Sequence, residues 1–67
     1  NSILSSLPLG SPLDRICSVS DHMGYRLSPL KHSFSILDSP YSCVLSHGRK
    51  TIATLYLDRS LKLTRVQ

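Results

Sequence analysis

The sequence predicts an α+β fold of two layers, in which one N-terminal helix packs on a four-stranded antiparallel β-meander. Three observations lead there: alternating apolar and polar residues in the last third of the chain, short polar segments between those runs, and helix start and stop signals near residues 12 and 24. Successive side chains of a strand point to opposite faces, so each alternating run offers one apolar face for a helix to cover. A small all-β barrel or β-sandwich is the alternative.

Three alternating runs lie between Tyr41 and Val66. Their apolar positions are Tyr41, Cys43 and Leu45 in the first run, Ala53, Leu55 and Leu57 in the second, and Leu61 and Leu63 in the third. The connecting segments 47–50 and 58–60 are short and polar, and Gly48 can adopt the positive φ that a hairpin turn often needs. The three runs therefore predict a three-stranded meander.

A helix is expected from Pro12 to about Met23. Ser11 is a good N-cap residue, Pro12 suits the first helical position, and Asp14 completes a capping box. Gly24 is a typical residue just beyond a helix end. The face expected against the sheet carries Leu13, Ile16, Cys17 and Ser20.

The segment between the helix and the meander supports two interpretations. Phe34 and Ile36 alternate with serines, which favours a strand from Ser33 to Leu37 paired with the strand at Tyr41 through the turn 38–40. The alternative is a helix opened by Ser28-Pro29, with an apolar stripe of Leu27, Leu30, Phe34 and Leu37. The strand is the interpretation that completes a four-stranded sheet.

The chain of 67 residues is expected to form one small domain over residues 11–67, preceded by a flexible N-terminal arm over residues 1–10. The arm carries apolar residues that would pack on the sheet or on a neighbouring chain: Ile3, Leu4, Leu7 and Leu9. A domain of this size buries only about 60% of its unfolded surface. We therefore expect a homo-oligomer or a subunit of a larger protein assembly.

The charge balance is basic, with eight Lys and Arg against four Asp, no Glu and a net charge of +4. Such a balance favours polyanionic partners such as RNA, DNA or an anionic membrane surface, and it also serves solubility. Tyr56 is expected on the same sheet face as Lys62 and Thr64, so its ring would lie among cations as in proteins that bind single-stranded RNA. The predicted nucleic-acid or polyanion site comprises Arg49, Lys50, Tyr56, Arg59 and Lys62. The competing interpretation is a solvated basic face with a half-exposed tyrosine.

Cys17 and Cys43 are the only cysteines, and each falls on the apolar side of its predicted element. A disulfide between them would staple the helix to the sheet, whereas the alternative is two reduced thiols packed as small apolar groups. The spacing of the cysteines and histidines argues against zinc, because Cys43 and His47 would lie roughly 13 Å apart on an extended strand. No metal site is expected.

The sequence contains no motif for catalysis. The glycine-rich phosphate loops are missing, the Ser, His and Asp residues show no convergent spacing, and so small a chain builds no large pocket. We expect a protein that is not an enzyme, has no cofactor and has no transmembrane segment, since no apolar run approaches about 20 residues.

Three functions fit these observations. The first is a small basic interaction protein that acts in an oligomer or assembly and contacts RNA. The second is a secreted, disulfide-stapled ligand, toxin or defence peptide. The third is a viral accessory protein from an overlapping reading frame that binds host factors, suggested by a composition rich in Ser and Leu but without Glu.

Overall fold

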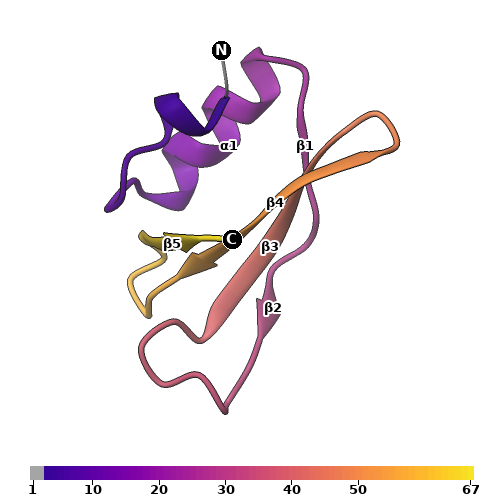
Figure 1. Cartoon of the computed structure of the whole chain (residues 1–67). Helices are drawn as coiled ribbons and strands as arrows, with labels where there is room; N and C mark the ends of the chain where they lie inside the picture. Colours follow the sequence, from indigo (N-terminus) through magenta and orange to yellow (C-terminus); the bar gives the residue numbers. More distant parts are fainter. Residues whose placement is uncertain (1–2) are drawn as a thin grey trace.

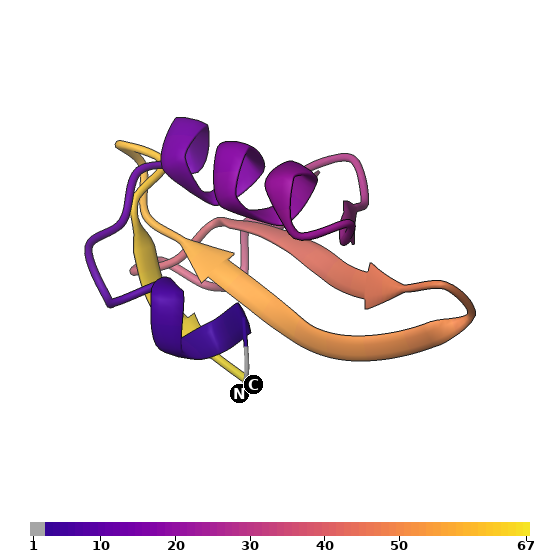
Figure 2. The same cartoon turned by 90° about the horizontal axis from the view of Figure 1, so that it is seen from above.

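The computed structural model describes residues 3–67 and has an α+β fold. An antiparallel sheet of five strands is covered on one side by helix α1 (Leu13–His22) and by a short 3₁₀ helix, η1 (Ile3–Ser6), as Figures 1 and 2 show. The sheet is an open path with two edges, so the barrel alternative is excluded. The expected arrangement of one helix on an antiparallel sheet is confirmed.

The sheet is built around a long hairpin. Its strands are β1 (Arg26–Leu27), β2 (Lys31–His32), β3 (Tyr41–His47), β4 (Lys50–Leu57) and β5 (Leu63–Val66). The order is β1-β3-β4-β5, and β2 also pairs with β3. The predicted three-stranded meander is therefore present as β3, β4 and β5. Gly48, with φ 63°, is the first of the two residues that turn β3 into β4.

The predicted strand from Ser33 to Leu37 is wrong, and so is the helical alternative. These residues belong to an irregular loop in which Phe34 is 86% exposed and Leu37 74% exposed. The free edge of β3 is taken instead by β1 and β2, which pair with its two halves. Pro29 lies between them, and a proline without an N–H is tolerated on an edge strand where it would interrupt a central one.

Helix α1 matches the expected range, and Gly24 follows its end with φ 78°. The predicted capping box is wrong, because no side chain caps the helix. The Ser11 hydroxyl donates instead to the Pro8 carbonyl over 2.6 Å. The first helical N–H, that of Leu13, donates to the Leu61 carbonyl over 2.9 Å, which ties the start of the helix to the turn between β4 and β5.

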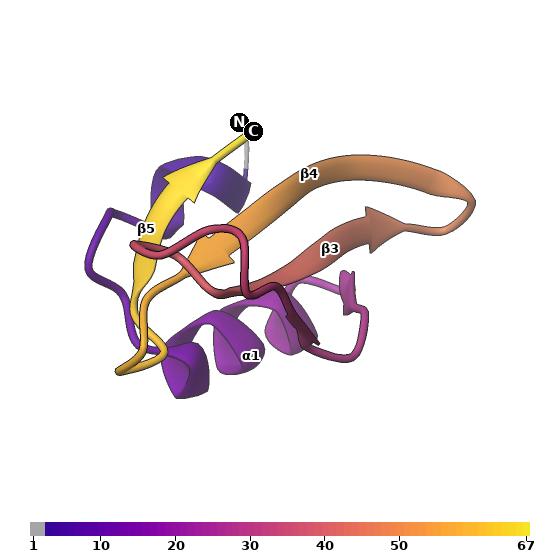
Figure 3. The ribbon, with the colours of Figure 1, turned by 90° about the horizontal axis from the view of Figure 1, so that it is seen from below.

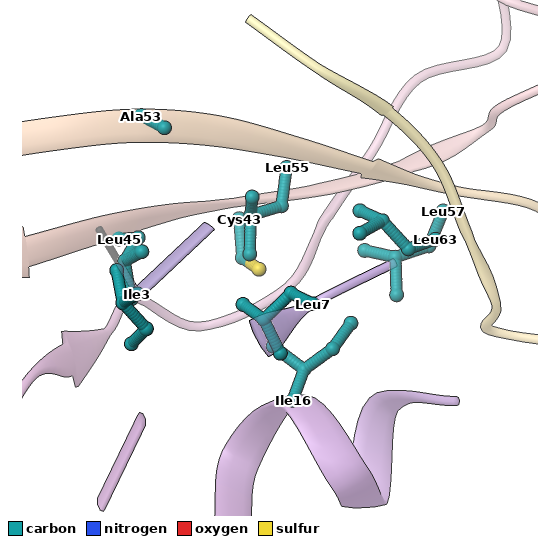
Figure 4. Packing of buried hydrophobic residues seen from close by; sticks show 9 residues of the cluster. All are labelled: Ile3, Leu7, Ile16, Cys43, Leu45, Ala53, Leu55, Leu57 and Leu63. Atoms are coloured by element: carbon teal, nitrogen blue, oxygen red, sulfur yellow. The ribbon is translucent and has the colours of Figure 1, made fainter. Parts of the chain in front are cut away.

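The core lies between the sheet and the two helical segments (Figure 4). Ile16 of α1 packs against side chains from the inner face of the sheet, and the full set is Ile3, Leu7, Ile16, Cys43, Leu45, Ala53, Leu55, Leu57 and Leu63. Ile3 and Leu7 of the predicted N-terminal arm lie in this core. The apolar residues of the arm were expected to pack on the sheet or on a neighbouring chain, and these two pack on the sheet. Asn1 and Ser2 of that arm lie outside the described residues, and its flexibility stays a prediction.

Candidate nucleic-acid interface

The face of the sheet turned away from the helices carries a row of four residues. In Figure 3 this face lies in front and the helices behind it. Lys31 pairs with Ser42, Ser42 with Tyr56, and Tyr56 with Arg65, so one residue from each of β2, β3, β4 and β5 stands side by side. Directly opposed residues of antiparallel strands share a face. We call Lys31, Ser42, Tyr56 and Arg65 the outer row.

The outer row faces away from the core because of the strand period. Leu55 and Leu57, on either side of Tyr56, are fully buried beneath the helices. Tyr56 between them must point to the opposite face, where it is half-buried. Sequence periodicity predicted this orientation of Tyr56, and the structure agrees.

A cation–π contact joins the last two members of the row. The Arg65 guanidinium carbon lies over the Tyr56 ring, 4.3 Å from the ring centroid. This distance is well within the roughly 6 Å over which a cation is attracted to a ring face. Arg65 is exposed and was not among the predicted site residues, so the cation nearest to Tyr56 is one that the sequence did not reveal.

The irregular pairing of β4 with β5 explains this difference. The register shifts between Tyr56 and Leu57, so Arg65 lies opposite the ring. Thr64, predicted on this face, donates from Oγ1 to the Tyr56 carbonyl over 3.1 Å and shares a 2.6 Å hydrogen bond with the Ser39 hydroxyl. Lys62 is exposed just before β5, where it forms an isolated bridge with Pro12.

The other predicted cations do not gather around Tyr56. Arg49 lies in the hairpin turn between β3 and β4 and Lys50 begins β4, whereas Arg59 and Lys62 belong to the turn between β4 and β5. Figure 1 shows these two turns at opposite ends of the sheet. The five predicted residues therefore form two separate basic ends with Tyr56 between them.

The charged residues at the outward-facing strand positions are all cations. Arg26 pairs with Ser46 while its neighbour Leu27 pairs with buried Leu45, so Arg26 stands on the outer face, as do Lys31 and Arg65. None of the five strands that the structure describes contains an acidic residue. The four aspartates belong to helix α1, the loop before β3 and the turn after β4: Asp14, Asp21, Asp38 and Asp58.

The two cysteines are free thiols in contrasting environments: Cys17 is exposed on α1 and Cys43 is buried in the core. The expectation that Cys17 lies on the apolar side of its helix is therefore wrong. Burial, and to a smaller extent the Cys17 thiol nearby, raises the pKa of the Cys43 thiol above its usual range. The predicted disulfide stays a prediction.

An open cleft of about 820 Å³ lies beside the C-terminal half of α1, with Cys17, Ser20 and Tyr25 among its lining residues. Tyr25 stacks on His47 with the ring centroids 4.6 Å apart. The Ser20 hydroxyl oxygen is buried and has no hydrogen-bond partner among residues 3–67. The cleft thus presents mixed polar and apolar side chains.

Among residues 3–67, no three His, Cys, Asp or Glu side chains come close enough together to hold a metal ion. Within the same range, no helix has the length and apolar character needed to cross a membrane. Comparisons of the chain with protein-family models, with curated proteins and with solved structures found no match.

Proposed function

We propose that the protein is a non-enzymatic interaction module that binds single-stranded RNA through the outer face of its sheet. The observation that carries the proposal is the outer row, in which Tyr56 lies between the backbones that position Lys31 and Arg65. An exposed sheet face with a ring among cations suits a single strand, because cations bind its phosphates and aromatic rings stack on its bases.

The dimensions of the face support an extended ligand. Lys31 and Arg65 are separated by three strand spacings, which places their Cα atoms roughly 14 Å apart. Arg26 extends the same basic surface toward the other end of β3. A flexible strand can follow these three cations.

Charge complementarity supports the same class of ligand. The net charge is +4, and the outer face has cations without a neighbouring acidic residue on the strands. Binding three phosphates of a single strand should give a slope of log K against log salt of about −2. Affinity should then fall roughly 20-fold between 50 and 200 mM salt.

The test is fluorescence anisotropy with a labelled, unstructured RNA of about 12 nucleotides, titrated at several salt concentrations. We expect Lys31→Gln and Arg65→Gln each to weaken binding and to reduce the salt slope by about 0.7. Arg15→Gln is the matched control, since it removes the same charge from an exposed position on α1, on the other side of the sheet. The proposal fails if the wild-type protein does not bind at low salt, or if the control weakens binding as much as the two row variants.

A second candidate function is binding to another protein, either a further copy of the chain or another subunit of an assembly. It is supported by the loop before β3, where Phe34 and Leu37 are largely exposed. His32 contacts Phe34 edge-on and Tyr41 at a tilt, which gives this end of the molecule an aromatic surface. Native mass spectrometry at micromolar concentration tests it: a species larger than the monomer that is lost in Phe34→Ser would support self-association.

A further inference from the structure

We infer that the outer face holds one unpaired base in a slot above Ser42, between the free face of the Tyr56 ring and the Lys31 side chain. This inference rests on the proposed function and names the part of the nucleic acid that the site recognises. The phosphates on either side of that base would contact Lys31 and Arg65. The ligand class is single-stranded nucleic acid with an accessible base, in contrast to a polyanion in general.

The first step in the argument is the orientation of the Tyr56 ring. Arg65 is the cross-strand neighbour of Tyr56 on the β5 side, and its guanidinium lies over the ring at 4.3 Å. One face of the ring is therefore occupied by Arg65. On the other side of Tyr56, the directly opposed residue is Ser42 of β3.

The second step is the size of the side chains along the row. Ser42 is small and stands between two long side chains, Lys31 on β2 and Tyr56 on β4. The backbones that carry those two side chains are two strand spacings apart, about 9.5 Å. A planar base stacked on the ring, with the Lys31 ammonium beside it, fits such a gap.

The third step is the order of the slot before a ligand arrives. The cation–π contact with Arg65 restrains the ring, so less side-chain freedom is lost when a base stacks on it. Ser39 is buried and bonded to Thr64, which holds the loop before β3 on the outer side of the sheet, in front of β5 and the end of β4 in Figure 3. The slot is thus bounded by groups that other contacts already hold in position.

A base within a double helix is stacked on both faces and cannot enter the slot. We therefore expect single-stranded RNA to bind at least about fivefold more tightly than a duplex of the same length, although the duplex carries twice the charge. Inorganic polyphosphate supplies charge without bases and should bind through the cations alone. It should compete with RNA weakly and in a strongly salt-dependent manner.

The decisive variant is Ser42→Leu, which fills the slot and changes no charge. We expect it to weaken binding of the single-stranded RNA by about fivefold or more, while binding of polyphosphate stays within about twofold. Ser46→Leu is the matched control, because Ser46 is on the same strand and the same face but opposite Arg26 and away from the ring. Circular dichroism and thermal unfolding of both variants confirm that each is folded.

Two results separate this inference from the proposed function. If the wild-type protein binds neither RNA nor polyphosphate, the proposed function fails and the slot with it. If it binds duplex and single strand equally, or if Ser42→Leu and Ser46→Leu have equal effects on RNA binding, the inference of a base slot is wrong while polyanion binding stands.

Arg65→Lys gives a further check, since it keeps the charge but replaces the planar group over the ring. It should weaken RNA binding by a larger factor than polyphosphate binding.

Discussion

At the edge of the sheet between β1 and β2, the Val44 N–H donates to the hydroxyl of Ser28 and not to a backbone carbonyl. The Val44 N–H donates to Ser28 Oγ over 2.8 Å, and the Ser28 N–H donates to the Val44 carbonyl over 2.9 Å. Because of this exchange, the edge can be interrupted at Pro29 without leaving the Val44 N–H unpaired. The pairing resumes one residue out of register at Lys31, opposite Ser42.

This relationship predicts that Ser28→Ala destabilises the protein. The Val44 N–H, in a half-buried strand, would lose this acceptor, which costs about 1 kcal/mol. For a domain of this size the midpoint of thermal unfolding should fall by roughly 4–8 °C. Ser60→Ala, at an exposed turn position, is the control and should shift the midpoint by much less. Equal shifts in the two variants would show that the hydroxyl bond does not contribute.

The central hairpin could be predicted from the sequence because its signals are local. The period-two pattern over β3 and β4 is long enough to define both the strands and the buried face, and Gly48 marks the turn. The edge strands could not be predicted in this way. β1 and β2 are two residues each, and their pairing depends on the free edge of β3 rather than on a pattern of their own. Residues 33–37 show the alternating pattern, but the edge of β3 with which they were expected to pair is taken by β1 and β2.

The candidate site was predictable in part for the same reason. The outward direction of Tyr56 follows from the period of β4. The identity of its neighbour does not, because the register shift after Tyr56 decides which residue of β5 stands opposite the ring. Lys31 was missed as well, since it joins the row only through the edge strand. Cations predicted from charge density alone are instead divided between two distant turns.

The turn between β4 and β5 contains a strained residue. Leu61 has φ 60°, the sole positive φ at a non-glycine position within residues 3–67. Side chains branched at Cβ tolerate this conformation least, whereas Asn adopts it readily. We expect Leu61→Val to be less stable than Leu61→Asn by about 1 kcal/mol in urea unfolding, although burial alone would favour Val at this half-buried position. The reverse order would show that side-chain burial outweighs the backbone conformation here.

The unequal environments of the cysteines predict stepwise thiol labelling. Native protein treated with a thiol reagent such as Ellman's should react rapidly at Cys17 and slowly at Cys43, which becomes reactive only when the core opens. Denatured protein should react at both. Cys17→Ser should abolish the rapid phase and keep the slow one. If protein prepared without reductant shows no reactive thiol even after denaturation, it contains the disulfide expected of a secreted domain.

The raised pKa of the Cys43 thiol predicts a loss of stability at alkaline pH. Burial raises the pKa of the thiol in the folded protein, whereas in the unfolded chain the thiol ionises near the ordinary cysteine pKa of about 8.5. Below that pH both states are protonated and the contribution of Cys43 is fully present. As the pH rises above this unfolded-state pKa, the unfolded state loses its proton first. The free energy of unfolding therefore falls, by at most about 1.4 kcal/mol per pH unit, until the folded pKa is reached.

Urea unfolding between pH 7 and pH 10 should show this slope in the wild-type protein and in Cys17→Ser. In Cys43→Ala the slope should be smaller, even though that variant is less stable at every pH because it leaves a small cavity in the core. Parallel curves for the wild-type protein and Cys43→Ala would mean that the slope comes from other groups that ionise in this range, such as the tyrosines and lysines.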